Sequence, residues 1–149
     1  MLICTTGVDL VKISRVGRIL ARYGDRFLKR IYTPAELLCS KGQATELAAR
    51  FAAKEAVSKA LGVGVRLLSP SGIGWLDVET LNDPRGKPYL VLHRRARALA
   101  AAQGLTTWSI SLSHDGGMAI AFVVALGLSG TPEAGTEPTL TAILPQHKE

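Results

Sequence analysis

Hydrophobic and polar positions alternate with different periods along the chain, and each period predicts an element. Residues 2–12 are rich in β-branched side chains and predict a strand, in which Gly7 allows a bulge or a close backbone approach just before Asp9. Over residues 14–31, apolar positions recur every three or four residues, which predicts a helix. Ser14 is the expected N-cap of that helix, and a glycine at position 24 is expected to divide it in two.

Two more helices are predicted before the middle of the chain. Thr33 and Glu36 form a capping box with a proline between them, so a short helix should occupy residues 34–40. A longer helix is expected over residues 44–61, and Gly62 is expected to end it. This longer helix is the central element of the predicted fold.

The second half of the chain predicts two β-hairpins separated by a helix. An irregular stretch rich in glycine, serine and proline comes first, over residues 62–74. The elements predicted after it are strands 75–81 and 87–93, a helix at 94–103, and strands 107–113 and 118–126 joined by the polar link 114–117. This order predicts an α+β fold: a single compact domain in which a largely antiparallel sheet packs against the long central helix.

The composition changes near the end of the chain. Three of the seven prolines fall after residue 128, among threonine, glycine and glutamate. We therefore expect a folded domain over residues 1–128 and a tail without a fold of its own over residues 129–149.

Length and composition restrict the class of protein. A chain of 149 residues with 47% hydrophobic content can bury one core but is short for two domains. Cys4 and Cys39 match no metal-binding spacing and are too few to staple the fold, which favours a reducing, cytoplasmic location. The N-terminus does not resemble a signal peptide, and the longest apolar run, residues 118–126, is too short for a bilayer span. No association with membranes is expected.

The net charge of +6 lies in one segment, residues 12–30. Its cations recur every three or four residues and should line one exposed helical face with few acids between them; they include Arg15, Arg18, Arg22 and Arg26. Such a face suits an acidic partner. A basic nucleic-acid-binding module is the alternative, but the face lacks the interleaved aromatic side chains that stack on bases, and no nucleic-acid partner is expected.

The central helix carries an acid in an apolar setting. Leu47 and Phe51 fall on one side of Glu55 and small alanines on the other, so little of the helix is left to face water. A carboxylate placed there loses hydration unless a partner compensates it. Lys59 lies one turn further on, and Arg50 and Lys54 lie nearby. Acid and base on one mostly buried helix suggest a functional site.

Other candidate residues stand near the ends of strands: Asp9 in the first, and His114 with Asp115 between the last two. Two carboxylates with open positions are an ordinary way to hold a magnesium ion that also binds substrate phosphates. Sequence spacing alone does not place Asp9 beside Glu55, so independent structural roles stay open at this point.

Four segments in order resemble the signatures of the holo-acyl-carrier-protein synthases, a bacterial 4'-phosphopantetheinyl transferase family. They are GVDLVKISRV, RFAAKEAVSKALG, GKPYLVL and SISLSHDGGMAIAFVVA, within residues 5–126. The resemblance implies a 4'-phosphopantetheinyl transferase-like fold. It also implies transfer of phosphopantetheine from coenzyme A to a serine of an acidic acyl carrier protein for fatty acid biosynthesis, releasing 3',5'-ADP. It further implies Mg2+ and a homotrimer with active sites between subunits.

The resemblance assigns roles to individual residues. Asp9 and Glu55 match the metal ligands, and Lys59 matches the lysine that meets the coenzyme A phosphates. The residues similar to the nucleotide-binding positions are Arg50, Gly62 and His114. The implied catalytic set is Asp9, Glu55, Lys59, His114 and Asp115, and the arginines at 15, 18, 22 and 26 become the carrier-protein face. Glu55 through a water, Asp115 and a metal-bound hydroxide all stay open as acceptors of the serine proton.

Overall fold

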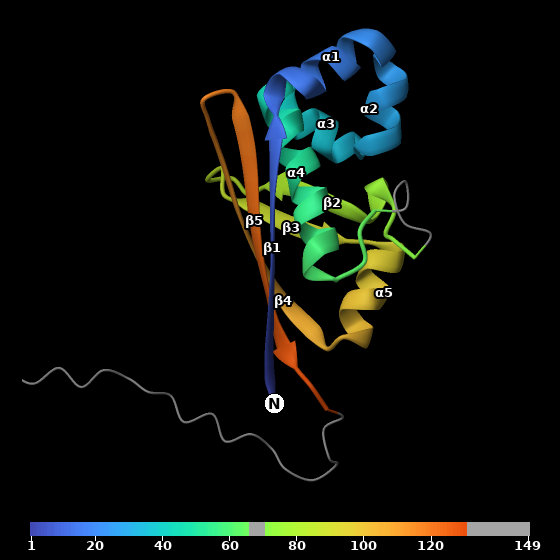
Figure 1. The fold of residues 1–149 in the computed structure, drawn as a ribbon, viewed down its shortest axis with the longest axis vertical. Coiled ribbons are helices and arrows are strands. Elements are labelled where there is room, and N and C mark those ends of the chain that lie inside the picture. Colours follow the sequence, from blue (N-terminus) through green and yellow to red (C-terminus); the bar gives the residue numbers. More distant parts are fainter. Residues whose placement is uncertain (66–70, 131–149) are drawn as a thin grey trace, which may run out of the picture.

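Three long antiparallel strands form the main sheet, and the longest helix lies against one face of it (Figure 1). In the computed structural model, which describes residues 1–65 and 71–130, the strand order is β1 (Leu2–Lys12), β5 (Met118–Leu128), β4 (Leu105–Asp115). The helix is α4 (Ala44–Ala60). The predicted α+β class and its antiparallel sheet are confirmed. The predicted tail beyond residue 130 lies outside the described residues.

The remaining elements surround this pair. They are α1 (Ile13–Tyr23), α2 (Asp25–Ile31), α3 (Pro34–Ser40), the short 3-10 helix η1 (Trp75–Asp77), the antiparallel pair β2 (Val78–Asn82) and β3 (Pro88–Leu92), and α5 (Arg94–Ala102). The capping box of Thr33 and Glu36 is present as predicted. None of the helices within the described ranges has the length and hydrophobicity needed to span a bilayer.

Three local predictions were wrong. Helix α1 begins at Ile13, and its N-cap is Lys12 rather than Ser14. Residues 75–77 form a 3-10 turn rather than the start of a strand, because the backbone N–H of Asp77 bonds to the Gly74 carbonyl. The last two strands include His114 and Asp115, which leaves only two glycines for their turn.

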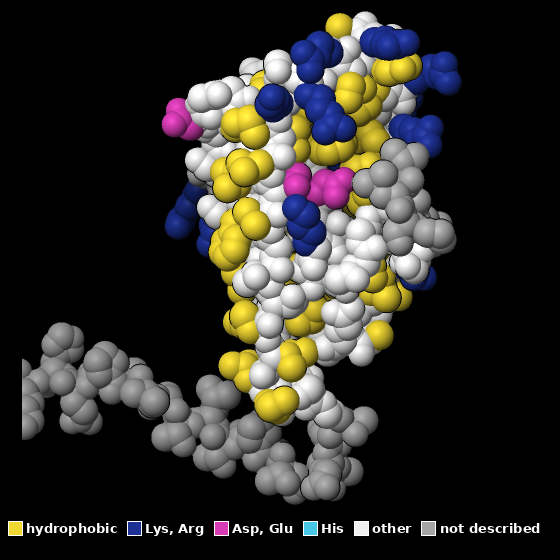
Figure 2. All heavy atoms as spheres, in the orientation of Figure 1, with side chains coloured by type: hydrophobic (Ala, Val, Ile, Leu, Met, Phe, Trp, Pro, Cys, Tyr) yellow, Lys and Arg dark blue, Asp and Glu magenta, His cyan; other side chains and the backbone are white. Residues whose placement is uncertain are grey.

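Helices α1 and α2 meet at Gly24, as the sequence predicts, and together carry six of the 18 lysine and arginine side chains. Figure 2 shows Lys and Arg side chains gathered over this end of the molecule. Arg15, Arg18, Arg22 and Arg26 are all exposed. Tyr23 is 49% exposed, and its ring centroid lies 5.3 Å from the guanidinium carbon of Arg22.

Strand β1 packs directly on α4 at Gly7. A Cβ at that position would lie 1.8 Å from the carbonyl oxygen of Ala56, so no side chain fits. The hydroxyl of Thr5 donates to the carbonyl of Ala60 at 2.8 Å, one turn further along the helix. The pairing of β1 with β5 runs without interruption, so Gly7 serves a close approach and not a bulge. This contact sets where Asp9 lies relative to α4.

Helix α4 is buried around nearly all of its circumference, as predicted. Ala52, Ala53 and Ala56 are fully buried, and Ala60 is nearly so. Small side chains allow the strand and the helix to lie close together, which explains why this helix is so rich in alanine.

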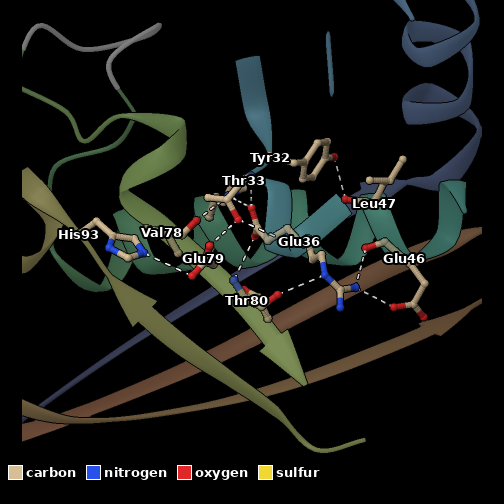
Figure 3. Close-up of polar contacts among 11 residues, drawn as sticks. Tyr32, Thr33, Glu36, Glu46, Leu47, Val78, Glu79, Thr80 and His93 are labelled. Carbon is tan, nitrogen blue, oxygen red and sulfur yellow. Dashed lines mark hydrogen bonds and ion pairs between the residues drawn. The ribbon is translucent and has the colours of Figure 1, made fainter. Parts of the chain in front are cut away.

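A buried ion pair joins α4 to α3. The Lys54 ammonium lies 2.7 Å from the Glu36 carboxylate, and neither side chain is exposed. The same carboxylate accepts the backbone N–H groups of Thr33 and Thr80, each at 3.0 Å, and Figure 3 shows Glu36 between these two residues. Lys54 also donates to the Val78 carbonyl. The network therefore holds α3, α4 and β2 together around two charges that are each compensated.

Replacing Lys54 by methionine is expected to lower the free energy of unfolding by about 3–5 kcal/mol, because it leaves the Glu36 charge buried without its partner. Urea denaturation at neutral pH measures this loss. The exposed Lys29→Met serves as control and should change stability by less than about 0.5 kcal/mol. Equal stabilities for the two variants would show that the buried pair contributes nothing.

Candidate active site

Asp9 and Lys59 meet where β1 passes α4. The Lys59 ammonium donates to Asp9 Oδ1 at 2.9 Å and to the backbone carbonyl of Val8 at 2.9 Å. The Lys59 side chain is 52% exposed and that of Asp9 is 17% exposed, so the pair lies at the surface and is open to a ligand. Fifty residues of sequence separate the two, and the close packing at Gly7 brings them together.

Glu55 completes this group of charges. Partial burial raises the pKa of Glu55, and the negative charge of Asp9 raises it further, while Lys59 and Arg15 act in the opposite direction. Because the charge of Asp9 acts on Glu55, these two carboxylates lie near one another. Figure 2 shows acidic side chains side by side on this face, between basic ones. The structure thus brings together Asp9, Glu55 and Lys59, as the resemblance implies.

The donor set suits a hard cation. Within the described residues, no cluster of three or more histidine, cysteine, aspartate or glutamate side chains could hold a metal by itself. Asp9 and Glu55 supply carboxylate oxygens, and magnesium needs only one or two such ligands when waters and substrate phosphates complete its shell. A cation there would also relieve the repulsion that raises the pKa of Glu55.

His114 and Asp115 lie elsewhere. They belong to β4, which is separated from β1 by β5, so they stand at the opposite edge of the sheet from Asp9. Two strand spacings amount to about 10 Å. Within one chain, the structure does not bring His114 or Asp115 to the group formed by Asp9, Glu55 and Lys59.

His114 lines a cavity of about 240 Å³, together with Glu46, Asn82 and Pro88. This cavity opens between α4, the β2–β3 pair and β4. The sequence offered no sign of it, because its walls come from four separate segments.

Arg50 lies inside the molecule. Its side chain is fully buried, and its guanidinium donates to Glu46 at 2.7 Å, to Asn82 at 3.2 Å and to the Thr80 carbonyl at 3.2 Å. Because two of these partners line the His114 cavity, Arg50 supports the cavity wall from behind. The role of Arg50 toward a nucleotide stays a prediction.

Gly62 follows α4 with φ of +73°, a conformation that favours glycine, and it ends the helix about two turns beyond Glu55 and three residues after Lys59. The prediction that Gly62 ends the helix is confirmed. Its role toward a nucleotide stays a prediction.

An apolar cavity of about 410 Å³ adjoins the acidic group, and sequence analysis missed it. Arg15 and Arg26 stand at its rim, and its walls include Ile19, Phe27, Phe51 and Trp75. The rings of Phe51 and Trp75 stack with centroids 4.8 Å apart. Phe51 precedes Glu55 by one helical turn. This spacing was the one sign in the sequence that an apolar surface lies beside the acid.

The sequence of this chain is similar to those of known proteins. A sequence model described as the 4'-phosphopantetheinyl transferase superfamily matches residues 5–123. The holo-[acyl-carrier-protein] synthase of Herpetosiphon aurantiacus is 48% identical over 124 residues, which cover 82% of this chain and 98% of that protein.

The fold is also similar to those of solved holo-[acyl-carrier-protein] synthases. A Helicobacter pylori holo-[acyl-carrier-protein] synthase in complex with coenzyme A superposes with a TM-score of 0.71 at 33% identity, covering 80% of this chain and 98% of that one. A Bacillus anthracis holo-(acyl-carrier-protein) synthase in complex with CoA (3',5'-ADP) gives 0.67 at 32% identity, covering 86% and 100%. The matched segment, residues 5–123, runs from within β1 through α4 into β5. Because it covers most of the sequence, the chain belongs to the 4'-phosphopantetheinyl transferase superfamily.

Proposed function

We propose that this enzyme transfers 4'-phosphopantetheine from coenzyme A to a serine of apo acyl carrier protein, giving holo carrier protein and 3',5'-ADP. The observation that carries the proposal is the grouping of Asp9, Glu55 and Lys59 at the surface where β1 meets α4. Its closely related proteins are named for this activity, and one solved relative holds coenzyme A.

We propose that Asp9 and Glu55 hold Mg2+ at this site. When bound, the ion would supply charge neutralisation for the pyrophosphate oxygens of coenzyme A. Lys59 adds a fixed positive charge beside Asp9, and its exposure allows the ammonium to reach a phosphate. Both carboxylates stay in place through their own elements, since β1 and α4 are packed without a gap.

The chemistry needs positioning and charge more than a nucleophile from this chain. The serine oxygen of the carrier protein forms a bond to the phosphorus that bears pantetheine, and the bond to the 3',5'-ADP oxygen breaks. Glu55 lies one helical turn from Lys59, and as a metal ligand it would accept the serine proton through a bound water. Asp115, at the far edge of the sheet, could reach this site only from another subunit.

We further propose a homotrimer with active sites between subunits. The sheet face turned away from α4 exposes large apolar side chains along its whole length, which is unusual for a monomer: Leu2, Val8, Leu10, Phe122, Leu126 and Leu128. Figure 2 shows hydrophobic side chains along the sheet. A second copy on this face would cover it and could bring its His114 edge to the Asp9 edge of its neighbour.

Mixing two inactive variants tests whether the site is shared. Asp9→Asn and His114→Ala homo-oligomers are each expected to transfer at least about 10²-fold more slowly than wild type. Co-refolded mixtures should recover a measurable part of wild-type activity, because some interfaces then pair an intact Asp9 with an intact His114. Activity that never exceeds that of the separate variants would place both residues in the same subunit's site.

The arginine ridge, Arg15, Arg18, Arg22 and Arg26, is proposed to bind the carrier protein. Arg15 and Arg26 line the apolar cavity, and Arg15 also acts on the charge of Glu55, so a carrier protein on the ridge would have its serine near the acidic group. Acyl carrier proteins are expected to be acidic, which suits a ridge with few acids of its own.

Raising ionic strength is expected to increase the KM for apo carrier protein by about tenfold between low and physiological salt, because screening weakens steering between opposite charges. The kcat should change much less. Steady-state rates at several sodium chloride concentrations measure both. Arg18→Gln should show a shallower dependence, whereas a salt-independent KM for wild type would exclude electrostatic docking.

The function is tested by incubating the protein with coenzyme A, apo carrier protein and Mg2+, and measuring the mass of the carrier protein. A phosphopantetheine increment on the acceptor serine is the expected result, and its absence would refute the proposal. Salt-sensitive binding to random DNA without any increment would favour the nucleic-acid-binding alternative, which gives Asp9 and Glu55 no role. A place in fatty acid biosynthesis and a cytoplasmic location stay proposals from the family resemblance and the cysteine content.

A further inference from the structure

A second basic cavity lies beyond the arginine ridge, where α2, η1 and the start of α5 meet. It has a volume of about 410 Å³, and its walls include Arg30, Arg94 and Arg95 with the apolar side chains of Trp75 and Leu76. We call it the α5 pocket. None of these three arginines belongs to the acidic group or to the ridge.

The charge in the α5 pocket is largely uncompensated. Arg30 and Arg94 are exposed, and no hydrogen bond or ion pair joins either side chain to another described residue. Arg95 donates from Nε and Nη2 to the Ser71 carbonyl, at 3.2 and 2.7 Å, which holds its guanidinium in place without neutralising it. Among the described residues that line the pocket the single acid is Asp77, which is 5% exposed and accepts the Gly74 N–H at 2.9 Å. The opening is therefore positive.

The α5 pocket continues from the ridge. Arg30 and Trp75 line both the α5 pocket and the apolar cavity whose rim carries Arg15 and Arg26. Basic side chains thus follow one another from α1 through α2 to the first residues of α5, with apolar side chains between them. A single acidic macromolecule seated on the ridge would reach this surface, whereas a small anion would use only one part of it.

The backbone at Arg94 supports a binding role for its side chain. Its φ of +42° lies in the left-handed region, which a residue with a side chain rarely adopts at the start of a helix. Such conformations persist where the surroundings hold them and are concentrated at binding sites. Here the conformation occurs at the residue that presents an exposed guanidinium to the pocket.

We propose that the α5 pocket is a second docking contact for the acidic carrier protein, with Arg94, Arg95 and Arg30 binding carboxylates on the partner at a distance from the reacting serine. This inference rests on the proposed function and extends its protein-binding surface by one helix. The proposed function places the coenzyme A phosphates at Lys59, which does not line this pocket.

Arg94→Glu tests the proposal, with Arg97→Glu as matched control. Both substitutions make the same charge change on exposed positions of α5, but only Arg94 lines the pocket. Binding of fluorescently labelled apo carrier protein at low salt should weaken by about tenfold for Arg94→Glu, and by less than twofold for Arg97→Glu. The KM for coenzyme A should stay unchanged in both, and the salt dependence of binding should become shallower only for Arg94→Glu.

Equal binding by the two variants would overturn the proposal. Inorganic phosphate that binds the pocket through Arg94 while carrier binding is the same in phosphate and in chloride at equal ionic strength would also overturn it, because the pocket would then be a small-anion site. Binding and transfer are measured separately, so the two proposals can fail independently. Wild type that binds the carrier protein but yields no phosphopantetheine increment would refute the enzymatic function alone, and wild type that does not bind it would refute the docking contact.

Discussion

Glu55→Gln is expected to lower the rate of phosphopantetheine transfer by about 10²–10³-fold, the effect of removing one charge that acts at the reacting centre. Glutamine has nearly the size of glutamate, so the packing of α4 should stay the same while the negative charge beside Asp9 is lost. Steady-state assays at increasing Mg2+ concentration would show a raised requirement for the ion in addition to the lower rate.

The pH dependence of the same variant separates its role from a structural one. Because burial and Asp9 raise the pKa of Glu55, this side chain takes up a proton at a higher pH than an ordinary glutamate as the solution is acidified. Because Mg2+ competes with this proton for Glu55, wild-type activity at limiting Mg2+ should fall on acidification from above the usual range of a carboxyl group, and Glu55→Gln should lack that limb of the profile.

Stability should move in the opposite direction from activity. A carboxyl group whose pKa is raised by folding destabilises the folded state when it is ionised, and this destabilisation disappears as the pH falls through the raised pKa. Glu55→Gln should accordingly be at least as stable as wild type at neutral pH. The exposed Asp25→Asn should change neither activity nor its pH profile. Full transfer by Glu55→Gln would refute the metal assignment while leaving superfamily membership intact.

Gly7→Ala is expected to reduce both stability and activity more than an alanine substitution usually does. The new Cβ would lie 1.8 Å from the Ala56 carbonyl oxygen, and both neighbours are backbone, so β1 and α4 must separate by more than an ångström. Overpacking of this kind costs about 1–3 kcal/mol, and sometimes more. Asp9 moves with the strand, and a displacement of about 1 Å at a catalytic group can cost about 10²-fold in rate.

Gly17→Ala is the matched control. Gly17 lies inside α1, where the nearest atom to a new Cβ is 4.0 Å away, so alanine should fit and should stabilise the helix by about 0.5–1 kcal/mol. Thermal unfolding and the transfer assay, run on both variants, compare the same chemical change in two settings. If Gly7→Ala keeps the melting temperature of wild type and its rate within twofold, the close approach of β1 and α4 does not position Asp9.

Local sequence signals predicted most of the elements. The break at Gly24, the capping box at Thr33 and the end of α4 at Gly62 each depend on residues only a few positions apart, and all three are present. The N-cap of α1 and the turn at residues 75–77 were wrong, because the preceding strand and the packing of Asp77 against Gly74 decide those boundaries.

Contacts between distant segments were not predictable. Glu36 was identified only as a capping residue, yet it also binds Lys54, 18 residues further on, and the backbone of Thr80. The hydrogen bonds from Arg50 to Thr80 and Asn82 on β2, which bury its side chain, also join segments about 30 residues apart. The apolar cavity beside Glu55 and the α5 pocket each combine side chains from several elements, and no period in the sequence relates those elements to one another.

The sequence by itself determined that an acid lies on a helix with almost no face open to water, that the positive charge is concentrated in residues 12–30, and that four ordered motifs match one family. Those properties follow from helical periodicity and composition, which are local. The tertiary structure alone decided that Asp9 meets Lys59 beside Glu55, because only the absence of a side chain at Gly7 allows β1 to pack against α4 there. It also decided that His114 stands at the opposite edge of the sheet, since strand order depends on pairing between distant segments rather than on any one of them.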